Sequence, residues 1–201
     1  MNELTTLLRR EVWEHRSIVT APLVFAGIYI LVVLLAVAGA ITIHVNDYGV
    51  DLKDMARSLD SANAGAVMQI GLASLAVTFN GLMLFVTLFY LLDSLYADRK
   101  DKSILFWKSL PVSDMQIVTS KLVTGAVVIP AVTMVVWFFT SIAGYLIGGT
   151  TIALSGSTAI LAAGPGAILD TTLLFIYGFI VQSLWYMPLF GWLLLVSAWS
   201  R

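Results

Sequence analysis

The chain contains no cysteine, and only 11% of its 201 residues are charged. Without cysteine it can form no disulfide, no thiolate metal site and no cysteine nucleophile. A soluble domain usually carries about 25% charged residues. Here 59% of the residues are hydrophobic, which leaves too little polar surface to keep a folded domain in water. We therefore predict that the protein lies in a lipid bilayer.

Motifs for catalysis and nucleotide binding are missing as well. The two histidines, His15 and His44, fall on opposite sides of the predicted membrane and cannot share a site. The sequence has no His-Glu-x-x-His zinc motif, no Gly-x-Ser-x-Gly nucleophile elbow and no Gly-x-x-x-x-Gly-Lys-Ser/Thr phosphate loop. We predict that the chain is not an enzyme, has no catalytic residues, and needs no metal ion, cofactor or nucleic acid.

Four long apolar segments predict an all-α fold, a polytopic membrane helix bundle that forms one domain over residues 1–201. At a rise of 1.5 Å per residue, each segment is long enough to cross a hydrocarbon core of about 30 Å. The expected spans are 18–43, 67–92, 122–147 and 167–198, with a lead-in at 1–17 and loops at 44–66, 93–121 and 148–166.

The lead-in predicts an amphipathic helix that lies in the membrane interface. Leu4, Leu7, Leu8 and Val12 recur at helical spacing among charged residues, and Trp13 suits headgroup depth. The alternative is a short solvated helix that leads into the first span. Because these residues mix acids and bases, we do not expect a cleavable signal peptide.

Several local signals predict where the helices start, end or bend. A second amphipathic helix is expected over 52–59, ended by 63–65 (Asn-Ala-Gly). The triplet 164–166 (Gly-Pro-Gly) predicts a turn, which puts Asp170 in the first turn of the last span, where a carboxylate suits the helix dipole. Pro130 predicts a kink.

Two groups of residues inside the spans are of interest. Gly144 and Gly148 form a small-residue pattern that favours close helix packing. In the second span Asn80 lies near mid-bilayer, where an unpartnered amide is costly. We expect Asn80, with Thr78 and Gln69, either to hold helices together or to line a translocation path.

Orientation follows from the placement of the basic residues. Nine of the eleven Lys and Arg fall in the lead-in, in the 93–121 loop and at the C-terminal end. With four spans these regions share one side of the membrane. The positive-inside rule therefore predicts that the N-terminus is cytoplasmic.

The most charged stretch, 98–113, is the best candidate site. Basic side chains surround the apolar run 104–107, within a short helix that could run from Ser103 to Leu110. Ser113 and Gln116 have the spacing of a capping box for the next helix. The aromatic residues of the stretch would either anchor in the membrane interface or fill a groove on a partner.

The segments 8–14, 96–114 and 120–122 resemble the permease subunits of bacterial ABC transporters, in the type-two exporter-like branch. The resemblance implies a multi-pass protein of the bacterial plasma membrane, in which 3–16 is an elbow helix. It also implies that 98–113 is a coupling helix that docks on a separate ABC ATPase subunit, and that the permease pairs as a homodimer or heterodimer. The implied docking residues are Arg99, Lys100, Lys102, Phe106, Trp107, Lys108 and Leu110.

Family permeases usually have six spans, so four spans lead us to expect either a fragment of a longer protein or a natural short form. Two other functions stay open. One is a membrane-anchored structural or assembly protein whose basic loop binds anionic membrane lipid. The other is a secondary carrier, which the lack of an ionisable residue deep in a span disfavours, although Asn, Thr and backbone carbonyls could bind sodium.

Overall fold

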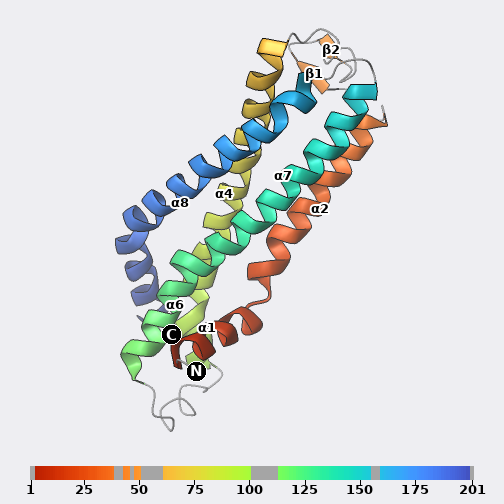
Figure 1. Cartoon of the computed structure of the whole chain (residues 1–201). Coiled ribbons are helices and arrows are strands. Elements are labelled where there is room, and N and C mark those ends of the chain that lie inside the picture. Colours follow the sequence, from red (N-terminus) through yellow and green to blue (C-terminus); the bar gives the residue numbers. More distant parts are fainter. Residues whose placement is uncertain are drawn as a thin grey trace. The chain divides into compact units, whose positions relative to one another are not determined.

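The computed structural model describes residues 3–38, 43–45, 48–50, 61–100, 113–154 and 159–199 (Figure 1). A π-helical segment, η1 (Thr124–Val128), joins α6 to α7, and β1 (Ile43–Val45) pairs with β2 (Tyr48–Val50) in an antiparallel hairpin. The helices are α1 (Glu3–Glu14), α2 (Ser17–Val37), α4 (Ser61–Lys100), α6 (Asp114–Val123), α7 (Ile129–Leu154) and α8 (Ala159–Trp199).

Four helical segments are long and apolar enough to cross a membrane. They confirm the predicted α-helical fold with four transmembrane helices, and the chain is a multi-pass membrane protein. The segments are Ser17–Val37, Met68–Lys100, Asp114–Thr150 and Gly164–Trp199. The hairpin of β1 and β2 was not predicted; each strand has three residues.

The helix predicted in the lead-in is confirmed as α1. Two other expected helices, over 52–59 and over 103–110, lie outside the described residues.

A predicted helix end at 63–65 and a predicted turn at 164–166 are both wrong. Residues 63–65 lie inside α4, and residues 164–166 lie inside α8. A glycine in a helix interior costs about 1 kcal/mol and a proline, here Pro165, about 3 kcal/mol, and the long helices α4 and α8 form in spite of these costs. Because α8 already begins at Ala159, Asp170 lies several turns from its N-terminus and not in its first turn.

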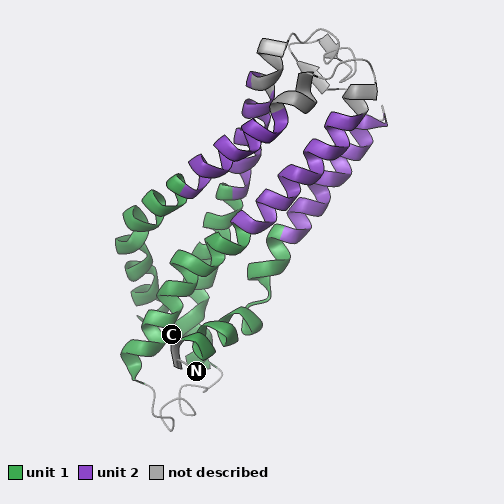
Figure 2. Ribbon diagram, in the orientation of Figure 1, with its two compact units in different colours: residues 1–22, 80–133, 177–201 green, residues 23–79, 134–176 purple. Residues whose placement is uncertain are grey.

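The chain divides into two compact units, which are described separately (Figure 2). Unit 1 comprises residues 1–22, 80–133 and 177–201, and unit 2 comprises residues 23–79 and 134–176. The core of unit 1 consists of Ile18, Met83, Tyr90, Leu91, Ala126, Ile129, Phe190, Leu193 and Leu194.

Aromatic side chains and glycines pack unit 2. Phe79 and Trp137 are fully buried in its core. A Cβ on Gly144 would lie 3.2 Å from Cε1 of Tyr29, so α7 and α2 approach closely at this glycine, whereas Gly148 has open space around it. Gly164 is held still more tightly, because a Cβ there would overlap the ring of Tyr145. The close packing against Tyr145 explains why residue 164 is a glycine, although it lies inside a helix and not in a turn.

Candidate functional site

Three charged side chains from three helices meet inside unit 1 and form what we call the Lys121 cluster: Glu11 of α1, Asp98 of α4 and Lys121 of α6. The Lys121 Nζ lies 3.0 Å from Glu11 Oε1 and 2.9 Å from Asp98 Oδ2. The side chains of Lys121, Glu11 and Asp98 are 1%, 5% and 13% exposed. Burial of a charge is costly unless it is paired, and here one ammonium serves two carboxylates.

Neighbouring polar groups use the remaining oxygens of the cluster. Tyr90 Oη donates a hydrogen bond of 2.8 Å to Glu11 Oε2, and His15 packs edge-on against the Tyr90 ring with centroids 4.9 Å apart. Arg10 Nη2 lies 4.0 Å from Asp98 Oδ1. Helix α1 packs against both α6 and η1. The polar contacts therefore fix α1 to the ends of α4 and α6.

The start of α6 is set by the predicted capping box, which is confirmed. The Gln116 amide donates to Ser113 Oγ at 3.2 Å, and the Ser113 amide donates to Gln116 Oε1 at 3.0 Å. The two bonds satisfy backbone donors at the N-terminus of the helix and fix where it begins. Two turns later, Lys121 points into unit 1, toward Glu11 and Asp98.

The last turn of α4 is also tied to α8. Ser197 Oγ accepts hydrogen bonds from the amides of Leu95 and Tyr96, at 3.2 and 3.1 Å. Arg99 Nη2 donates to the Ser197 carbonyl at 2.6 Å. The chain thus enters the predicted docking stretch from a helix end that is held on two sides, by α8 and by the Lys121 cluster.

Most of the predicted docking residues lie outside the described part of the chain. Of the seven, the structure describes two: Arg99, which is partly buried and bonded to α8, and Lys100, which is exposed. The five outside the described residues are Lys102, Phe106, Trp107, Lys108 and Leu110. Their role in docking stays a prediction.

Asn80 has an interhelical partner that the sequence did not reveal. Its Nδ2 donates a hydrogen bond of 2.7 Å to Gln182 Oε1, which joins α4 to α8 within unit 1. In unit 2, Thr78 is exposed and donates to the Ser74 carbonyl of its own helix, and Gln69 is exposed. The choice between helix packing and a translocation path for these residues stays a prediction.

A second feature of unit 1 is the π-helical segment η1. The Ile129 amide bonds to the Thr124 carbonyl five residues earlier. The next residue, Pro130, has no N–H to offer the Ala126 carbonyl. Ser183 Oγ of α8 supplies the donor instead, at 3.0 Å. A π-helical segment, a feature that is frequent at functional sites, therefore lies just before Pro130, and the kink expected there stays a prediction.

The sequence did contain a signal for the Lys121 cluster that sequence reasoning missed. Glu11 follows Leu4, Leu7 and Leu8 at the next position of the apolar stripe of α1. An acid at an apolar position predicts a buried, paired charge. Across the described ranges, no group of three or more His, Asp or Glu side chains could hold a metal ion.

Four long apolar helices define an integral membrane protein. Its buried Lys121 cluster fixes α1 to the ends of α4 and α6. A family model described as ABC-2 family transporter protein matches residues 62–196. The chain belongs to this family of ABC transporter permeases, which confirms the resemblance seen in its sequence. No curated protein and no solved structure matches the chain.

Proposed function

We propose that this permease subunit uses ATP hydrolysis in a separate ATPase subunit to export a substrate across the bacterial plasma membrane. Residues 98–113 are the docking element. The observation that carries the proposal is the position of the Lys121 cluster, because Asp98 opens the docking stretch and Lys121 follows it along the next helix. The distribution of Lys and Arg supports a cytoplasmic position for this stretch.

The Lys121 cluster gives a route for force. Asp98 and Lys121 pair at 2.9 Å, and Glu11 pairs with the same ammonium at 3.0 Å. A push on the docking stretch would therefore move the ends of α4 and α6 together with α1. Separating the pair would leave uncompensated charges buried, at a cost of about 3–5 kcal/mol, so motion that keeps the three side chains together is favoured over motion that pulls them apart.

Docking itself combines steering by charge with apolar burial. Lys100, Lys102 and Lys108 would attract an acidic rim on the ATPase. Phe106, Trp107 and Leu110 would fill a groove, because buried aromatic side chains dominate binding energy at interfaces. Arg99 has a second role as well, since its bond to the Ser197 carbonyl holds the end of α4 in place.

The translocation path would form when two permease subunits pair, as a homodimer or a heterodimer. Asn80 and Gln182 are the polar pair that supports this part of the proposal. Gln182 Nε2 is buried and has no hydrogen-bond partner among the described residues. An unused donor beside Asn80 suits a polar group of a passing substrate. Thr78 and Gln69 are exposed and would contribute further polar groups.

The test is co-purification of the tagged chain in mild detergent, with the ATPase subunit quantified by mass spectrometry. We expect a stoichiometric P-loop ATPase with the native chain, and its loss with Trp107→Ala or Phe106→Ala. The matched control is Trp192→Ala, which removes an exposed tryptophan of α8. Equal ATPase recovery from Trp107→Ala and the native chain would refute docking at this stretch.

A salt series separates protein docking from lipid binding by the same stretch. Ionic strength screens contacts between basic side chains and a lipid surface. A groove filled by aromatic side chains depends less on charge, so ATPase recovery should persist at raised salt. The native chain alone, freed of ATPase, should show no ATP hydrolysis.

A further inference from the structure

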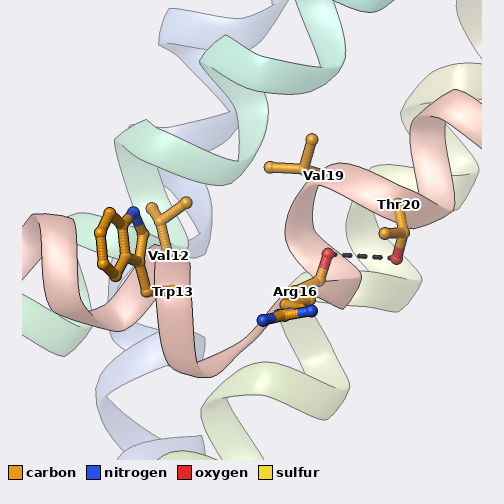
Figure 3. Close-up of a pocket in the computed structure, with 5 residues that line it drawn as sticks. All are labelled: Val12, Trp13, Arg16, Val19 and Thr20. Atoms are coloured by element: carbon orange, nitrogen blue, oxygen red, sulfur yellow. Dashed lines mark hydrogen bonds between the residues drawn. The ribbon is translucent and has the colours of Figure 1, made fainter.

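The junction between α1 and α2 contains a cavity that none of the functions above uses. We call it the elbow pocket; its volume is about 520 Å³, and it lies within unit 1 (Figure 3). Its lining consists of Val12, Trp13, Arg16, Val19 and Thr20.

The elbow pocket combines an apolar wall with a cation. Val12 and Val19 are partly buried, whereas the Trp13 side chain is 69% exposed. Arg16 is exposed and provides the guanidinium at the bend (Figure 3). Thr20 Oγ1 donates a hydrogen bond of 3.1 Å to the Arg16 carbonyl, which fixes the first turn of α2 around the pocket.

The charges near the elbow leave a net positive surface. Glu14 pairs with Arg10 at 2.7 Å, and Glu11 is occupied by Lys121. Arg16 forms no ion pair with any residue that the structure describes. The Arg9 guanidinium lies 5.1 Å from the centre of the Trp13 ring. The pocket therefore presents cationic groups beside an indole, with the nearby acids already paired.

The pocket also lies next to the start of the first candidate membrane span. The first membrane span begins at Ser17, directly after Arg16. Tryptophan and arginine at the start of a span suit the headgroup region, where the bilayer changes from polar to apolar. Helix α1 cannot drift from this position easily, because Glu11 fixes it to α6.

We propose that the elbow pocket binds an anionic phospholipid. The guanidinium of Arg16 would pair with the lipid phosphate, since its planar fork matches the oxygens of a phosphate. Arg9 would add charge, and the Trp13 indole N–H would donate to the headgroup. Val12 and Val19 would contact the glycerol and the first methylenes of an acyl chain. The proposal is independent of ATPase docking, so either can fail without the other.

The experiment is native mass spectrometry of the full chain in detergent, titrated with phosphatidylglycerol or with phosphatidylcholine of the same acyl chains. We expect the native chain to retain phosphatidylglycerol more strongly than phosphatidylcholine. Arg16→Gln should weaken its retention about fivefold, the loss expected for one cation near an anionic lipid surface. The matched control is Lys53→Gln, which removes a cation of the 44–66 loop, predicted on the opposite side of the membrane from the pocket, and should leave retention unchanged.

A second variant tests the cavity apart from the charge. Val19→Phe enlarges a side chain of the apolar wall, fills part of the pocket and should lower retention of both lipids. Helical content, measured by circular dichroism, shows whether the variant still folds. Equal retention of the two lipids by the native chain would overturn the proposal. So would equal losses from Arg16→Gln and Lys53→Gln, which would show a general charge effect, or unchanged retention in a folded Val19→Phe variant.

Discussion

Lys121 Nζ lies 2.9 Å from Asp98 Oδ2, so an ion pair joins the two helices that flank the proposed docking stretch. The same ammonium pairs with Glu11 at 3.0 Å. One buried lysine therefore fixes three helices of unit 1 to one another. The consequences of this arrangement and of three other contacts can be measured directly.

Lys121→Met should be strongly destabilising, because it leaves two carboxylates buried without a cation. We expect a loss of about 3–5 kcal/mol, seen as a lower unfolding temperature in detergent. Lys100→Met, at an exposed position of α4, is the control and should change little. A double variant, Glu11→Gln with Lys121→Met, should recover part of the loss. Similar unfolding temperatures for Lys121→Met and Lys100→Met would contradict a buried ion pair.

The Asn80–Gln182 hydrogen bond should show a measurable coupling energy. We expect about 0.6 kcal/mol between Asn80→Leu and Gln182→Leu in a double-mutant cycle, which is typical of interhelical hydrogen bonds in membranes. If Asn80 and Gln182 also line the translocation path, their substitution should lower transport activity by more than the loss of stability explains. Thr78→Val, at an exposed position, is the stability control. Strictly additive effects of the two substitutions would rule out the bond.

Ser183 and Pro130 should depend on each other. In the native chain Ser183→Ala removes the donor to the Ala126 carbonyl and should cost about 1 kcal/mol. Pro130→Ala restores a backbone N–H within reach of this carbonyl. In the Pro130→Ala variant, Ser183→Ala should lower the free energy of unfolding by much less than it does in the native chain. If denaturation in detergent gives the same cost in both backgrounds, the Ala126 carbonyl does not depend on Ser183.

Two glycines of α8 only two residues apart should respond in opposite directions to alanine. A Cβ on Gly164 overlaps the Tyr145 ring, whereas Gly166 has no neighbour within 4 Å. We expect Gly164→Ala to cost about 1–3 kcal/mol through overpacking. Gly166→Ala should be neutral or stabilise by up to about 1 kcal/mol, because alanine favours helix. Thermal unfolding of the two variants gives the comparison, and a neutral Gly164→Ala would mean that Tyr145 moves aside freely.

The sequence alone determined the membrane class, the four helices and the capping box of α6. Apolar runs longer than a bilayer core can satisfy their backbone only as helices, so length and composition were enough. The capping box was equally readable because Ser113 and Gln116 are three residues apart and the contact is local. Local signals failed where packing outweighed them, as at Gly164, which is explained by the Tyr145 ring and not by a turn.

The tertiary structure decided which polar groups meet. Glu11 and Lys121 are 110 residues apart, and Asn80 and Gln182 are 102 apart. The sequence shows that such groups are costly in a membrane protein, and Glu11 even occupies an apolar position of α1. It does not show the partner, because pairing depends on the rotation and approach of whole helices. Only the folded helices bring one ammonium between two carboxylates.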